Sequence, residues 1–132
     1  MKILLRTFGC CAIAVFLAFG ITARAAQPQN LGTPVGSIPV PGNLTAKEVQ
    51  EALIKAADGR KWTLVSRDDE SVVVRLDQGN WSARVAMLYT TREVQLFSNS
   101  TRKGKPKIPE NWLNYLKEDA TRILTSTSVL KE

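Results

Sequence analysis

Apolar residues between positions 44 and 57 recur with the period of an α-helix. They follow the i, i+3, i+4, i+7, i+8 spacing that gathers side chains into one buried stripe: Val49, Ala52, Leu53, Ala56 and Ala57. Thr45 and Glu48 form the T-x-x-E capping box that starts a helix, and Leu44 stands where a hydrophobic staple needs an apolar residue. Gly59 then provides a left-handed stop. The pattern predicts a helix over residues 44–57.

Four segments after this helix show the two-residue period of β-strands. They cover residues 61–66, 71–77, 80–89 and 93–98. Apolar side chains alternate there with polar ones such as Arg75 and Arg84, which is typical of an antiparallel sheet with one packed and one wet face. The polar connections between the segments are short enough for hairpins, at residues 67–70, 78–80 and 90–92.

A second helical pattern begins near Pro109, a residue that suits the first turn of a helix. Its apolar stripe consists of Trp112, Leu113, Leu116, Ala120, Ile123 and Leu124. The Thr-Ser-Thr-Ser run that follows has weak helix propensity, so we expect fraying after Leu124. The order α-β-β-β-β-α predicts an α+β domain in which two helices pack on one face of a four-stranded antiparallel sheet.

The first 25 residues have the layout of a secretory signal peptide. Lys2 and Arg6 precede an apolar run over residues 8–21, and Ala23-Arg24-Ala25 supplies small residues for cleavage. Cleavage predicts a periplasmic or secreted protein without a transmembrane span, and the alternative is an uncleaved anchor. Residues 26–43 are rich in proline and glycine, which predicts an extended linker before a single domain over residues 44–132.

Composition excludes much of the usual catalytic chemistry. The chain has no histidine, and both cysteines, Cys10 and Cys11, fall within the predicted signal. Ser-His-Asp triads, Cys-His pairs, thiolate sites and His-ligated zinc are therefore excluded for the predicted mature chain. We predict no catalytic residue, cofactor or metal. The acidic run at residues 68–70 lacks the spacing of a calcium loop, so we interpret it as a solvated turn.

Charge is concentrated in one short segment. Removal of residues 1–25, which hold three cations and no acid, lowers the net charge from +6 to +3. That balance gives no indication of nucleic-acid binding. Four cations in six residues, at Arg102, Lys103, Lys105 and Lys107, predict contact with an anionic envelope component or an envelope protein. Arg75 and Arg84, on the wet sheet face, would extend this patch if the fold brings them near it. The alternative interpretation of the basic run is a solvated loop.

Aromatic residues offer a second kind of contact. Trp81 and Trp112 lie on apolar stripes, as core residues do, although with Trp62 they would also suit a ligand groove. Phe97 has the opposite strand parity from its apolar neighbours and would join Leu88 on the open sheet face. That pair is the candidate apolar contact.

The stretches GRKW (residues 59–62) and IPENWLNYLKEDATRIL (residues 108–124) give the chain a resemblance to small exported proteins and putative lipoproteins of Gram-negative bacteria. In that group the first helix tends to end in Gly-Trp, and the last helix opens with Ile, a short polar stretch and Trp. The resemblance covers residues 44–124 and implies an exported α+β protein, with no functional residue carried over. The lipobox cysteine of such lipoproteins is missing here.

These observations favour a non-enzymatic exported binding or accessory protein. One alternative is an inhibitor of an envelope hydrolase. Another is a small carboxylate-based enzyme, for which the acids are scattered: Glu48, Glu51, Asp77, Glu93 and Glu110. The sequence leaves the ligand and the oligomeric state open.

Overall fold

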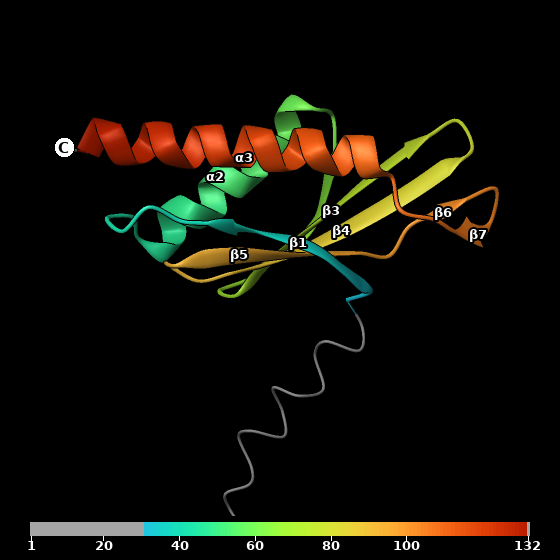
Figure 1. Cartoon of the computed structure of the whole chain (residues 1–132), viewed down its shortest axis with the longest axis horizontal. Helices are drawn as coiled ribbons and strands as arrows, with labels where there is room; N and C mark the ends of the chain where they lie inside the picture. Colours follow the sequence, from blue (N-terminus) through green and yellow to red (C-terminus); the bar gives the residue numbers. More distant parts are fainter. Residues whose placement is uncertain (1–30, 132) are drawn as a thin grey trace, which may run out of the picture. The chain divides into compact units, whose positions relative to one another are not determined.

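The computed structural model describes residues 31–131, in which two helices lie on one face of an antiparallel sheet (Figure 1). Five strands run in the spatial order β1-β5-β4-β3-β2. They are β1 (Thr33–Pro39), β2 (Thr63–Arg67), β3 (Ser71–Gln78), β4 (Trp81–Tyr89) and β5 (Glu93–Ser98). Two short strands, β6 (Thr101–Arg102) and β7 (Lys105–Pro106), form a hairpin joined to β4, and the helices are α2 (Ala46–Gly59) and α3 (Glu110–Lys131). The α+β class is confirmed, but the sheet has seven strands rather than four.

Helix α2 begins as the sequence predicts. The Thr45 hydroxyl accepts a hydrogen bond from the Glu48 amide (3.1 Å), and the Glu48 carboxylate accepts one from the Thr45 amide (2.9 Å). The buried residues are those of the predicted stripe: Val49, Ala52, Leu53, Ala56 and Ala57. The capping box and the amphipathic pattern are therefore confirmed.

The end of α2 differs from the prediction. Gly59 is still helical, and the left-handed residue is Lys61, with φ of 70°. The Lys61 amide donates to the Asp58 carbonyl (3.0 Å) and the Trp62 amide to the Ala57 carbonyl (3.0 Å), which is the Schellman pattern. Trp62 is only 4% exposed, so the reversal at Lys61 turns its indole back into the core.

Strand β1 comes from the segment for which the sequence predicts a linker. It pairs with β5 from Thr33 opposite Ser98 to Pro39 opposite Glu93. Its prolines are tolerated because β1 is an edge strand that pairs with β5 alone. On its other side no neighbouring strand needs an amide donor from β1. Ile38 is 2% exposed and belongs to the hydrophobic core. The linker interpretation is therefore wrong for residues 33–39.

The core lies between the sheet and the helices. Val72 and Val74 of β3 and Val85 and Met87 of β4 point toward the helices and are at most 1% exposed. The helices contribute fully buried leucines to the same cluster: Leu53, Leu116 and Leu124. Each such side chain contributes roughly 1.5–3 kcal/mol by leaving water. The alternation predicted for β3 and β4 is confirmed.

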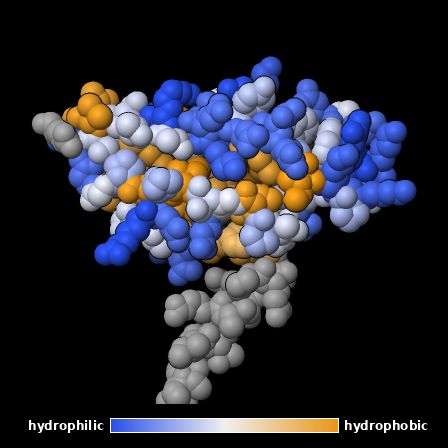
Figure 2. Space-filling view, in the orientation of Figure 1, coloured by the Kyte–Doolittle hydropathy of each residue, from blue (hydrophilic) through white to orange (hydrophobic). Residues whose placement is uncertain are grey.

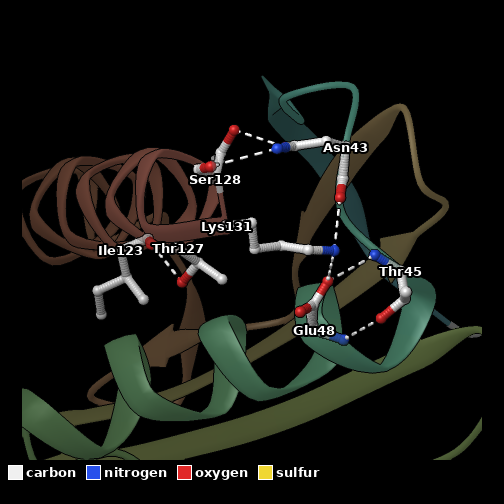
Figure 3. A network of polar contacts seen from close by, with 7 residues as sticks. All are labelled: Asn43, Thr45, Glu48, Ile123, Thr127, Ser128 and Lys131. Carbon is white, nitrogen blue, oxygen red and sulfur yellow. Dashed lines mark hydrogen bonds and ion pairs between the residues drawn. The ribbon is translucent and has the colours of Figure 1, made fainter.

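Helix α3 does not end near Leu124 but continues to Lys131. Its last turns are fastened to the segment before α2 (Figure 3). The Ser128 hydroxyl donates to the side-chain oxygen of Asn43 (2.6 Å), and the Lys131 ammonium donates to the Asn43 carbonyl (2.7 Å) and to Glu48 (2.8 Å). These contacts offset the weak local propensity, so the predicted fraying is wrong.

Neither helix in residues 31–131 combines the length and the apolar character needed to cross a membrane. The predicted signal peptide, residues 1–25, lies outside the described residues.

Candidate functional site

The run of cations after β5 is a hairpin rather than an irregular loop. Arg102 and Lys105 lie opposite each other in the β6–β7 pair, and the turn residues Lys103 and Gly104 have φ of 55° and 80°. Two left-handed residues in a two-residue turn are typical of a type I′ hairpin. The Lys103 amide donates to the Asn80 carbonyl (2.9 Å), which ties the turn to the β3–β4 connection. We call Arg102, Lys103, Lys105 and Lys107 the basic hairpin.

Pairing between β4 and β6 sets the direction of these side chains. Arg102 lies opposite Trp81, so the two side chains share the helix-covered face of the sheet. The Arg102 guanidinium stands 5.5 Å from the centre of the Trp81 ring, within cation–π range. Lys105 lies opposite Arg102 and faces the same way.

The basic hairpin carries its charge unpaired. All four of its cations are exposed, and none of them belongs to an ion pair among residues 31–131. Hydrophilic residues gather at the end of the molecule where Figure 1 places β6 and β7, as Figure 2 shows. The hairpin is therefore a fixed positive projection available to an anion.

Arg75 and Arg84 lie elsewhere. They are directly opposite each other on β3 and β4, on the sheet face that carries no helix. Arg75 forms an exposed ion pair with Asp77 (2.9 Å). Strand parity thus separates these two arginines from Arg102, and they form a second positive area rather than an extension of the basic hairpin.

Three tryptophans from distant parts of the chain meet beside the hairpin. The Trp112 ring lies 6.3 Å from the Trp62 ring in an edge-to-face arrangement and 5.6 Å from the Trp81 ring at an angle of 51°. Trp62 is buried in the core, whereas Trp81 and Trp112 are half-buried. The last two line a cleft of about 420 Å³ together with Ile108, Pro109 and Lys107. Trp81 and Trp112 therefore pack against each other and also border this cleft.

Leu88 and Phe97 do not form the exposed pair that the sequence suggests. Phe97 lies opposite Ala86 and Leu88 opposite Gln95, so both occupy the predicted open face. Both side chains are half-buried rather than exposed, however. Among residues 31–131 the exposed large apolar side chains lie elsewhere: Leu64, Val65, Ile108, Tyr115, Val129 and Leu130. The sequence did not indicate that Leu64 and Val65 are exposed, because the five-residue pattern of β2 is too short to show which face is packed.

The acidic run is built into the turn between β2 and β3. One Asp68 carboxylate oxygen accepts hydrogen bonds from the amides of Glu70 and Ser71, both at 2.8 Å. The Glu70 contact, with those from Ser71, holds the pKa of Asp68 below its ordinary value. Within residues 31–131 no group of three or more acidic, histidine or cysteine side chains is placed to hold a metal ion. The carboxylates considered for catalysis are spread over α2, β3, β5 and α3: Glu48, Glu51, Asp77, Glu93 and Glu110.

Two buried hydroxyls lie behind the hairpin. Ser98 and Ser100 are 4% and 6% exposed, and their Oγ atoms are 2.8 Å apart. Ser100 Oγ also accepts a hydrogen bond from the Arg84 amide (3.2 Å). These bonds satisfy polar groups where β5 leads into β6, so the serines serve to position the hairpin.

Comparison of the chain with models of known families and with curated proteins finds no match. The resemblance to small exported proteins therefore stays an expectation from the sequence.

Proposed function

We propose that this protein is an exported, non-catalytic binding or accessory protein that contacts an anionic component of the cell envelope. The observation that carries the proposal is the basic hairpin, with four exposed cations that have no ion-pair partner among residues 31–131. Because no acidic side chain in residues 31–131 pairs with these cations, an anionic ligand could contact all four of them directly.

The rigidity of the hairpin supports this role. Its turn is held by the Lys103 amide and its base by the Lys107 amide, which donates to the Ser100 carbonyl (3.1 Å). A preorganised set of charges loses less conformational entropy on binding than a flexible loop does. The cleft beside it adds two indole rings, which combine apolar area with a hydrogen-bond donor.

The non-catalytic part of the proposal rests on the residue types available. Without histidine, and with both cysteines in the predicted signal, the exported chain would have no imidazole or thiol for acid–base or nucleophilic work. Export rests on the layout of residues 1–25.

The test compares two charge reversals of equal size. In Lys103→Glu/Lys105→Glu the hairpin loses its charge, and in Arg75→Glu/Arg84→Glu the same change is made on the face that carries no helix. Each cation near an anionic surface contributes ~1 kcal/mol, so the hairpin variant should bind phosphatidylglycerol vesicles at least about tenfold more weakly. Vesicle co-sedimentation and a soluble polyphosphate titration measure this, with phosphatidylcholine vesicles as the neutral reference.

The control variant should retain the affinity of the original protein. Binding should also weaken with added salt, because exposed charges are screened beyond ~8 Å at physiological ionic strength. Equal losses in both variants, or no binding to either anionic probe, would rule out the hairpin as the contact site.

A further inference from the structure

The segment that leads from the basic hairpin into α3 borders two clefts. The first, here called the tryptophan cleft, is the one of about 420 Å³ beside Trp81 and Trp112. The second, here called the serine cleft, has a volume of about 480 Å³ and is lined by Thr33, Ser98 and Ser100. Two charged residues line both clefts: Lys107 and Glu110. Both volumes fall within the range of small-ligand sites, roughly 300–1,000 Å³.

We propose that these two clefts bind a sugar that carries a phosphate group. The proposal rests on the function proposed for the basic hairpin and names the chemistry of its ligand. In this arrangement the cations of the hairpin hold the phosphate, and the clefts hold the sugar. A free sugar phosphate and the head group of a phosphorylated glycolipid offer the same chemistry, and the experiment below distinguishes these two sources.

A buried hydroxyl group of the serine cleft has a hydrogen to donate. Ser98 and Ser100 are 4% and 6% exposed, and the bond between their Oγ atoms uses only one of their two hydroxyl hydrogens. Ser100 Oγ also accepts a bond from the Arg84 amide, which uses no hydroxyl hydrogen. The second hydrogen therefore has no acceptor among residues 31–131. A buried donor without a partner is costly, so a ligand oxygen that enters this cleft gains a hydrogen bond.

Two further polar side chains are suited to the hydroxyl groups of a sugar. Thr33 lies opposite Ser98, so the two hydroxyls share one face of the sheet beside the serine cleft. Glu110 lines both clefts, is exposed, and belongs to no ion pair among residues 31–131. Its carboxylate repels a bare anion but accepts hydrogen bonds from hydroxyl groups. The presence of Glu110 therefore favours a sugar phosphate over inorganic phosphate.

The tryptophan cleft combines aromatic surface with positive charge. Trp81 and Trp112 are half-buried, and their rings are inclined at 51° to each other. They therefore form no parallel slot that would sandwich a flat nucleotide base, whereas the C–H groups of a sugar pack against an indole without such a slot. The Arg102 guanidinium stands 5.5 Å from the centre of the Trp81 ring, and Lys107 lines the cleft. A phosphate on a sugar in this cleft would thus have two cations beside it.

Isothermal titration calorimetry with matched probes tests the ligand chemistry. Trehalose 6-phosphate contains a sugar and a phosphate, trehalose contains only the sugar, and inorganic phosphate contains only the anion. We expect trehalose 6-phosphate to bind at least about tenfold more tightly than either of the others, and more tightly than adenosine monophosphate. Vesicles that contain monophosphoryl lipid A, a phosphorylated disaccharide lipid, are compared with phosphatidylglycerol vesicles of equal charge. A preference for the first identifies a glycolipid head group as the source, and tight binding of trehalose 6-phosphate without that preference identifies a free sugar phosphate.

Two pairs of variants test the residues that would hold the sugar. Trp81→Leu removes ring surface and Thr33→Val removes a hydroxyl at nearly constant shape, and they should weaken the binding of trehalose 6-phosphate by about tenfold and about threefold. The matched controls lie outside both clefts. Tyr115→Leu removes an exposed aromatic ring of α3 and Ser37→Ala an exposed hydroxyl of β1, and both should leave the affinity unchanged. Thermal melting confirms that each variant is folded.

The outcomes separate this proposal from the function proposed for the hairpin. Lys103→Glu/Lys105→Glu should weaken the binding of both trehalose 6-phosphate and phosphatidylglycerol vesicles. If it weakens vesicle binding while trehalose 6-phosphate binds no more tightly than inorganic phosphate, the sugar proposal is wrong and the hairpin remains an anion contact. Tighter binding of adenosine monophosphate, or equal losses in each variant and its control, would also overturn the sugar proposal. If neither anionic vesicles nor trehalose 6-phosphate bind, both proposals are wrong.

Discussion

The Asp68 side chain organises the turn between β2 and β3. Its carboxylate accepts three hydrogen bonds, from the amides of Glu70 and Ser71 and from the Ser71 hydroxyl (3.2 Å). The Asp68 carbonyl accepts two more, from the Tyr89 hydroxyl (2.8 Å) and the Gln50 side chain (3.0 Å). One residue therefore links the turn to β4 and α2 through its carbonyl, and its carboxylate holds the turn itself.

The ionised carboxylate of Asp68 should stabilise the folded protein at neutral pH, and this contribution should be lost in acid. The hydrogen bond from the Glu70 amide, followed by those from Ser71, favours the carboxylate and lowers its pKa from 3.8. A lowered folded-state pKa gives stability that is present above the unfolded-state value and is lost as the pH falls through the folded-state value. Asp68→Asn should reduce the free energy of unfolding at neutral pH by about 0.5 kcal/mol, a small figure because the exposed group is screened by solvent.

The measurement is urea unfolding of both proteins at several pH values. Their difference should begin to shrink below the ordinary pKa of Asp68 and disappear below its lowered folded-state pKa, where the original side chain is neutral as well. Asp69→Asn changes a neighbouring carboxylate that accepts no hydrogen bond among the described residues, and it should have little effect at any pH. A difference between Asp68→Asn and the original protein that persists unchanged into acid would contradict the explanation.

At the scale of elements, the C-terminal third of α3 depends on contacts with a distant segment. Its Thr-Ser-Thr-Ser run is a poor helix former, yet Ser128 and Lys131 bond to Asn43 and Glu48 (Figure 3). The hydrogen bond from Lys131, followed by that from the Thr45 amide, lowers the pKa of Glu48. The same carboxylate thus caps the start of α2 and fastens the end of α3.

Asn43→Ala should release the end of α3 without unfolding the protein. It removes two side-chain hydrogen bonds to Ser128, at 2.6 and 3.2 Å, and both are exposed. We expect a loss of about 1 kcal/mol and faster hydrogen exchange of the amides at residues 127–131. Ser126→Ala alters an exposed hydroxyl of the same run and should change neither quantity. Unchanged exchange in Asn43→Ala would mean that the helix end is stable by itself.

Elements with a local signal were predictable, and those held by distant contacts were not. The capping box placed the start of α2, and strand periodicity placed β3, β4 and β5 within about one residue of their observed ends. The basic run was evident in the sequence. The sheet face on which its side chains lie was not, because that face is set by the pairing of Arg102 with Trp81. For the same reason the sequence placed Arg75 and Arg84 on the open face without showing whether that face adjoins the basic run. The serine cleft was missed because only the pairing of β1 with β5 brings Thr33 opposite Ser98.

At the scale of the whole molecule, the folded unit begins earlier than composition suggests. Proline and glycine indicated a linker up to residue 43, yet β1 adds a fifth long strand and covers the β5 side of the sheet. Gly32 approaches the Ser98 backbone so closely that an added Cβ would lie 2.3 Å from the carbonyl oxygen. Such a contact admits glycine alone, which marks the entry to β1 as part of the packed structure.

Ile38→Ala distinguishes an integral β1 from a loosely attached tether. Ile38 is 2% exposed, so truncation should create a cavity and lower the free energy of unfolding by roughly 2–4 kcal/mol, measured by urea unfolding. Ser37→Ala, on the exposed neighbouring position, should change it by less than about 0.5 kcal/mol. If the two variants lose the same small amount, β1 contributes little to folding and the linker would extend to residue 43. A large loss confined to Ile38→Ala would instead mean that the segment leading from the predicted export signal folds as part of the core, which leaves few residues between a cleavage site at residue 25 and the sheet.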